Sequence, residues 1–172
     1  MKKILLKTFF MITTLVLINN VNYAQTFSCV VNGNTFTGKV TEALQVNIGK
    51  QNFLQIKIQN GDKGMYLYLK VDKIKGELPV KLEYMPHNYE TGQTPDAEII
   101  WVPDGPDNPQ WNSIEGSSEI TKFDEAAKTI SGSFEFEIEK MVYGTDNQKE
   151  TAKIKDGKFE GIVYKIDVPT KK

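Results

Sequence analysis

The sequence predicts an all-β protein, an antiparallel meander of about nine or ten strands that forms a sandwich or a partly open barrel. Apolar and polar residues alternate with a period of two along most of the chain, which is typical of half-buried strands. Turn signals such as Asn32-Gly33 recur at short intervals, and no segment keeps the 3.6-residue apolar period of a long helix. Because strands twist, a sheet of this size must curl or pack against a second sheet.

Residues 1–24 have the order of a cleaved secretory signal peptide. Lys2, Lys3 and Lys7 precede an apolar run from Phe9 to Ile18, and the small residue Ala24 offers a cleavage site. A membrane span needs about 20 apolar residues, and this run has about half that number, so no membrane span is expected. The mature chain, residues 25–172, is then one β domain that is exported to the periplasm or secreted.

Cys29 is the single cysteine, so no internal disulfide is possible. Ser28 suits a lipid-attachment site, but Thr26 and Phe27 do not, and Cys29 lies well beyond the apolar run. No lipid anchor is expected, and Cys29 is predicted to be a small buried apolar residue.

The alternation predicts strands along the rest of the chain and assigns one face of each to the core. The residues expected on the buried face are Leu44, Val46, Ile48, Leu54, Ile56, Ile58, Met65, Leu67, Leu69, Val71, Val80, Leu82, Tyr84, Phe134, Phe136 and Ile138. Turns are predicted at Asn32-Gly33, at residues 60–64, at residues 124–128 and at Asp156-Gly157.

Residues 86–112 interrupt the alternation with five of the seven prolines and both tryptophans, around a short strand at 98–102. Proline donates no ladder hydrogen bond, so a long loop is predicted here, and loops on a rigid β scaffold often bind ligands. Aromatic rings beside amides and carboxylates suit a sugar, although the tryptophans would equally cap the core. The candidate ligand-binding residues are Tyr84, Tyr89, Trp101, Asp104, Asp107 and Trp111.

Several chemistries are excluded by residue counts. All 21 basic residues are lysine, and the net charge of −1 falls to about −4 without the signal peptide, which argues against nucleic-acid binding. A single histidine, His87, and a single cysteine leave no catalytic triad or zinc site.

Acidic residues gather in two places without predicting a site. Asp104, Asp107 and Asn108 offer oxygens to calcium, but their spacing matches no calcium loop, so neither a metal nor another cofactor is expected. Alternate glutamates at 135–139 are interpreted as a solvated face that pairs with Lys153 and Lys155 across strands, not as catalytic carboxylates.

The segments 119–124, 128–136 and 152–159, together with the Val-Asn-Gly turn that starts at Val31, form a recognisable series. The chain resembles a family of small exported β-rich domains of unknown function, secreted proteins or lipoproteins of Gram-negative bacteria. The resemblance implies an all-β fold and export, and it implies no activity.

We therefore expect a non-catalytic binding or interaction module of the bacterial envelope, whose ligand is a glycan, a peptide or an envelope protein held by the 86–112 loop. The alternative is a carrier with an apolar cavity inside a β-barrel, lined by Met65, Tyr66 or Tyr68.

Overall fold

The computed structural model describes residues 25–48, 51–74, 76–141 and 149–167, so the predicted signal peptide lies outside the described residues. These residues form one curled sheet of 11 strands, which confirms the all-β prediction. Its elements are β1 (Thr26–Val31), β2 (Asn34–Thr37), β3 (Lys39–Ile48), β4 (Gln51–Asn60), β5 (Lys63–Lys70), α1 (Val71–Ile74), β6 (Val80–Glu83), β7 (Ala97–Val102), β8 (Trp111–Asp124), β9 (Thr129–Lys140), β10 (Thr151–Val163) and β11 (Lys165–Ile166). Within these ranges, no helix is long and apolar enough to span a membrane.

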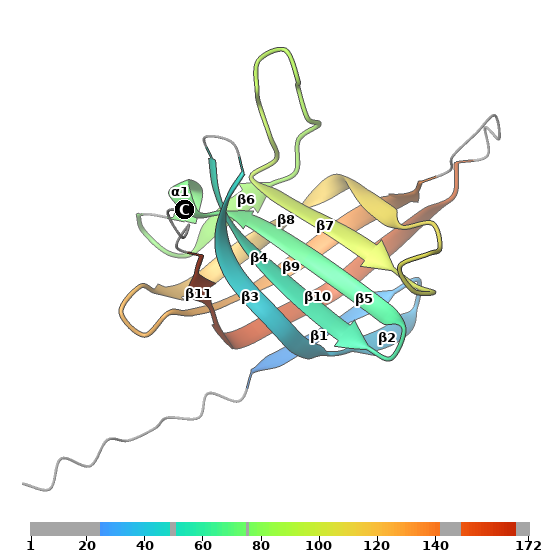
Figure 1. Ribbon diagram of the computed structural model, residues 1–172, viewed down its shortest axis with the longest axis horizontal. Helices are drawn as coiled ribbons and strands as arrows, with labels where there is room; N and C mark the ends of the chain where they lie inside the picture. The colour runs from blue at the N-terminus through green and yellow to red at the C-terminus, as the bar shows by residue number, and fades with distance from the viewer. Residues whose placement is uncertain (1–24, 49–50, 75, 142–148, 168–172) are drawn as a thin grey trace, which may run out of the picture.

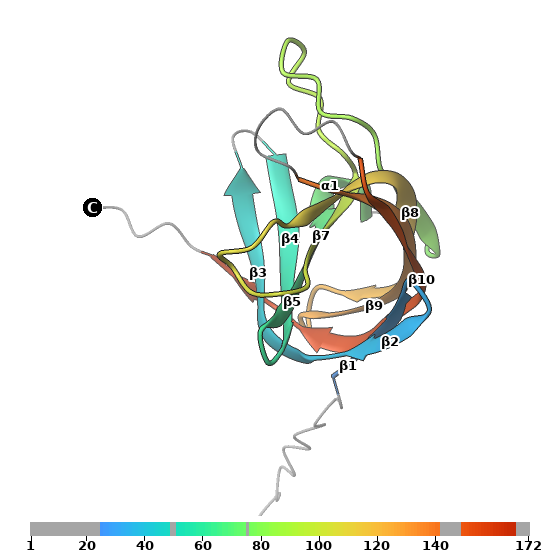
Figure 2. The same ribbon diagram turned by 90° about the vertical axis from the view of Figure 1, so that its right-hand side faces the viewer.

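The sheet has the strand order β11-β3-β4-β5-β7-β8-β9-β10-β1-β2, and β6 pairs with β8 beside this path. All pairs are antiparallel except the short β11–β3 pair. Because every strand belongs to one sheet, the molecule is a curled half-barrel and not a two-sheet sandwich (Figure 1). Seen end-on, β3, β4, β5 and β7 form a first wall, and β8, β9, β10, β1 and β2 form a second wall opposite it (Figure 2).

The long strand β8 has two partners along one edge. Its first residues pair with the end of β7, and Ser117–Ile120 pair with β6. Between these two ladders the buried Ser113 hydroxyl accepts the backbone N–H of Ile99 at 3.1 Å. This bond satisfies a buried donor where the two strands diverge. The loop 84–96 leaves the sheet between β6 and β7.

The core fills the interior with the apolar faces that the alternation predicts. Side chains expected to be buried on β4, β5 and β9, such as Ile56, Leu67 and Phe136, are at most 3% exposed. Aromatic rings crowd the second wall, where Phe134 stacks against Phe27 and Phe159 at centroid distances of 5.3 and 6.3 Å. These ring contacts make the second wall the aromatic part of the core.

The predicted facing of β3 is wrong. Leu44, Val46 and Ile48 lie on the outer face, and Ala43 is the buried residue of this strand. A bulge between Val40 and Glu42 is the reason. The extra residue of the bulge reverses, for the rest of β3, which side chains point inward.

Two of the predicted Asx-Gly turns, at Asn32-Gly33 and Asp156-Gly157, differ in outcome. Asn32 and Gly33 have φ of 47° and 79° and close the β1–β2 hairpin as predicted. Asp156, with φ of 52°, lies instead inside β10, where the pairing with β9 shifts register between Ile154 and Gly157. The turn prediction at Asp156-Gly157 is therefore wrong, because a bulge can use the same left-handed residue.

The strand predicted at 98–102 is present as β7. It divides the predicted 86–112 loop region into a loop at 84–96 and a second loop at 103–110, which lie at opposite ends of β7 (Figure 1). A six-residue strand is about 20 Å long, so the two loops are well separated. Both border the outer face of the first wall.

Candidate functional site

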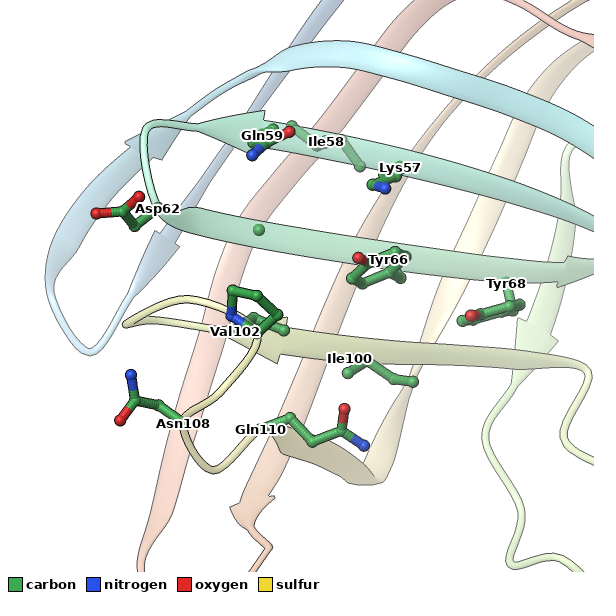
Figure 3. Close-up of a pocket in the computed structure, with 12 residues that line it drawn as sticks. Lys57, Ile58, Gln59, Asp62, Tyr66, Tyr68, Ile100, Val102, Asn108 and Gln110 are labelled. Carbon is green, nitrogen blue, oxygen red and sulfur yellow. The ribbon is translucent and has the colours of Figure 1, made fainter.

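A groove of about 370 Å³ lies on the outer face of β4, β5 and β7, under the loop 103–110 (Figure 3). We call it the β5 groove. Its lining residues are Lys57, Ile58, Gln59, Asp62, Gly64, Tyr66, Tyr68, Ile100, Val102, Pro106, Asn108 and Gln110. Aliphatic side chains and tyrosine rings form its floor, and amides and two opposite charges surround them. This mixture of an apolar surface and a few polar groups is typical of ligand sites.

Gly64 forms the hollow of the groove on β5, between Gln59 and Val102 of the neighbouring strands. A Cβ atom built on Gly64 meets no heavy atom closer than 3.8 Å, and its φ is not positive. Each of the other ten described glycines has either a positive φ or a neighbour within 2.5 Å of such a Cβ atom. A glycine weakens a strand and often marks a bulge, a tight bend or a place where a ligand or another backbone approaches closely. At Gly64 neither the backbone conformation nor the packing of neighbours requires a glycine.

The two tyrosines lie along β5, and their hydroxyls point towards the β4–β5 turn (Figure 3). The Lys57 ammonium lies 5.6 Å from the ring centre of Tyr66, a cation–π contact across the strand pair. Gln55 donates from Nε2 to the Tyr68 hydroxyl oxygen at 3.0 Å. Burial and the nearby Glu98 and Tyr66 raise the pKa of Tyr68, although the bond from Gln55 lowers it. The Tyr68 hydroxyl therefore keeps its proton at neutral pH, and this O–H group can donate a hydrogen bond to a ligand.

Three amides at the other end of the groove are held by local hydrogen bonds. Gln59 donates to the Gly61 carbonyl at 3.2 Å, Asn108 donates to the Asp104 carbonyl at 2.5 Å, and Gln110 donates to the Asn112 side chain at 3.3 Å. Each bond uses one N–H and limits the rotation of the amide. The carbonyl oxygen and the second N–H of each remain for a ligand.

The loop 84–96 lies beyond the Tyr68 end of the groove. Gln51, at the start of β4, donates to the Gly92 carbonyl at 2.9 Å and accepts from the Thr94 hydroxyl. These bonds fasten the loop to the first wall. In the same loop, His87 Nε2 lies 3.3 Å from the Oε2 atom of Glu98, a residue of β7.

The six predicted site residues are not brought together, and none of them lines the β5 groove. Trp101 is 7% exposed and points inward against Phe36, with a centroid distance of 4.8 Å. Trp111 and Tyr84 are half-buried against the core. The two tryptophans thus pack on the core, which is the alternative that the sequence left open, and Tyr84 packs there with them.

The other three predicted residues are exposed but lie at opposite ends of the groove. Asp104 and Asp107 belong to the loop 103–110, next to the lining residues Pro106 and Asn108. Tyr89 is 91% exposed in the loop 84–96. The sequence thus identified the loop 103–110, which borders the groove, and the loop 84–96 beyond its Tyr68 end, but it did not identify the groove.

The alternate glutamates of β9 lie on a charged outer surface. Lys153 Nζ is 3.7 Å from its register partner Glu137, and Lys149 Nζ is 3.3 Å from Glu139. The expected cross-strand pairing is thus present for Lys153, whereas Glu139 pairs with Lys149, which precedes β10 and was not predicted. In the part of the chain that the structure describes, no salt bridge joins Lys155 to a glutamate of β9. Among the described residues, no group of three acidic, histidine or cysteine side chains could hold a metal ion.

No protein-family model, curated protein or solved structure matches this chain. Its function is therefore inferred from the geometry of the groove.

Proposed function

We propose that the chain is an exported, non-catalytic binding module of the bacterial envelope that holds its ligand in the β5 groove. The observation that carries this proposal is Gly64, a strand glycine that neither backbone conformation nor packing requires. A side chain there would fill the groove. The donors of Lys57 and Tyr68 and the nearby amides supply the polar contacts that orient a ligand.

Export is proposed from the order of charge, apolar run and small residue in residues 1–24. Release as a free domain fits the position of Cys29, whose side chain is 1% exposed inside β1. Attachment of a lipid there would require β1 to leave its pairing with β2 and β10.

The carrier alternative finds less support. Met65, one of the residues expected to line its cavity, is fully buried among core side chains, whereas Tyr66 and Tyr68 line the outer groove. An apolar ligand inside the barrel would have to displace packed rings such as Phe134, which is unfavourable at the density of a protein interior.

A matched pair of substitutions tests the proposal. Gly64→Gln fills the groove with a long side chain, and Gly64→Ala adds one methyl group into open space. Wild-type protein is first screened by thermal shift against glycans, peptides, lipids and divalent ions, because a ligand that binds the folded state raises the melting temperature.

We expect at least one compound to raise the melting temperature of the wild type and of Gly64→Ala, and to have little effect on Gly64→Gln. A shift that persists in full in Gly64→Gln would assign the ligand to another surface and contradict the proposal. A panel without any shift for the wild type would contradict it as well.

A further inference from the structure

The polar and aromatic surface of the β5 groove continues beyond Tyr68. Tyr68 is the register partner of Glu98 on β7. The carboxylate of Glu98 contacts His87, and the imidazole ring of His87 stacks on Tyr89 with a centroid distance of 6.0 Å and an angle of 15°. From Gly64 to Tyr68 alone the strand advances about 13 Å. A continuous row of groups therefore leads from the groove to an exposed aromatic ring.

The Tyr89 ring is presented by an ordered turn. Asn88 and Gln93 exchange two backbone hydrogen bonds, of 2.9 and 3.1 Å. The Asn88 side-chain oxygen also accepts the backbone N–H groups of Glu90 and Thr91. Because the turn is already closed and the loop is fastened to Gln51, contact with a ligand at Tyr89 would order few additional groups.

The chemistry of the row favours a hydroxyl-rich ligand. Each amide at the groove offers both a donor and an acceptor, and a sugar hydroxyl can pair with either. Lys57 and Asp62 balance in charge, so the lining does not select an ion. The exposed ring of Tyr89 and the half-buried rings of Tyr66 and Tyr68 supply flat apolar faces against which the C–H face of a sugar can pack.

A peptide fits this surface less well. Strand addition needs a free sheet edge, and β5 is paired on both sides. A proline-rich helix would offer mainly carbonyl acceptors, because proline has no N–H, and the amide oxygens would then stay unpaired.

We propose that the ligand is a linear, neutral oligosaccharide that occupies the β5 groove and extends to an outer subsite formed by Tyr89 and His87. This inference rests on the binding function proposed above and adds the class and the extended form of the ligand.

The test is calorimetric titration of the mature protein with linear gluco-, xylo- and manno-oligosaccharides, from disaccharide to octasaccharide, and with a proline-rich decapeptide. In the wild type, the affinity for one of the sugar series should rise with chain length. Tyr89→Ala should weaken binding of the longest members by about tenfold, the range expected for one aromatic contact, and leave the shortest members unchanged. Glu90→Ala, on the same turn, is the matched control and should bind like the wild type.

Each of three results would overturn the inference. If the decapeptide binds, the sugars do not, and Gly64→Gln abolishes peptide binding, then the groove is a binding site for another class of ligand and the proposed function still holds. If Tyr89→Ala lowers the affinity for short and long sugars equally, or leaves both affinities unchanged, the proposed outer subsite is wrong. If a sugar binds equally to the wild type and to Gly64→Gln, the proposed groove itself is wrong.

Discussion

The two walls of the half-barrel use glycine in opposite ways. In the second wall, a Cβ atom on Gly132 would lie 2.3 Å from the Glu119 carbonyl oxygen and 2.7 Å from the ring of Phe159, and one on Gly157 would lie 2.5 Å from the ring of Phe134. In the first wall, a Cβ atom on Gly64 would meet only open space. In the second wall, core rings occupy the space that a side chain on Gly132 or Gly157 would need. In the first wall, the corresponding space beside Gly64 is empty and lies on the outer face.

This difference separates the part of the molecule that holds the fold together from the part available to a ligand. Rings that cross glycines bury large apolar areas and exclude water. A strand glycine with open space beside it is less stable than an alanine there, and such a glycine often marks a place that a ligand or another backbone approaches.

The largest expected effect compares two aromatic side chains. Phe134→Ala should lower the free energy of unfolding by about 3–5 kcal/mol, because it empties a site that is only 2% exposed. Tyr66→Ala, on the outer face of β5, should lower it by roughly 1 kcal/mol or less. Urea denaturation of both variants measures the difference. Equal losses would mean that the tyrosines of the groove serve the fold.

The next effect compares two added methyl groups. Gly132→Ala should destabilise the protein by roughly 1–3 kcal/mol, because the clash involves a backbone carbonyl that cannot rotate away. Gly64→Ala should stabilise it by roughly 0.5–1 kcal/mol, since alanine loses less conformational freedom in a strand. Chemical denaturation at one temperature gives both values, and a loss at Gly64 would contradict the claim that its hollow is free.

A pH dependence from the second wall has no effect near neutral pH and appears only in alkaline solution. Burial raises the pKa of the Cys29 thiol to about 12 from an ordinary value of 9.0. The unfolded chain therefore releases this proton first, so the stability that Cys29 contributes is complete below about pH 9 and is lost as the pH rises towards 12. Above about pH 9 the loss should approach about 1.4 kcal/mol per pH unit. Stability curves of the wild type and Cys29→Ala should diverge there, and parallel curves would show that the thiol is not buried.

The alternation of apolar and polar residues predicted most of the fold, because in most strands the apolar residues lie on the face that packs in the core. It failed at β3, where the bulge between Val40 and Glu42 adds a residue that no glycine or proline marks. It also failed at Asp156, because a turn and a bulge require the same left-handed conformation.

The site was harder to predict, because strand pairing between distant segments creates it. Tyr66 pairs with Ile100, and this places β5 beside the loop 103–110, more than thirty residues later in the chain. The tryptophans attracted attention through their composition, yet Trp101 follows Ala97 and Ile99 at alternate positions and so shares their inward phase. The outward tyrosines next to Gly64 were the informative signal.

The pairing of both β6 and β7 with β8 has a consequence for how such a protein can diversify. The ends of the loop 84–96 are held by the bonds from Tyr84 N–H to the Gly116 carbonyl and from Asp96 N–H to the Glu83 carbonyl, at 2.9 and 3.0 Å. These anchors belong to the sheet and do not depend on what the loop contains. The sheet of the half-barrel thus fixes both ends of this connection. Loops of other lengths and sequences can therefore join β6 to β7 while the groove stays unchanged.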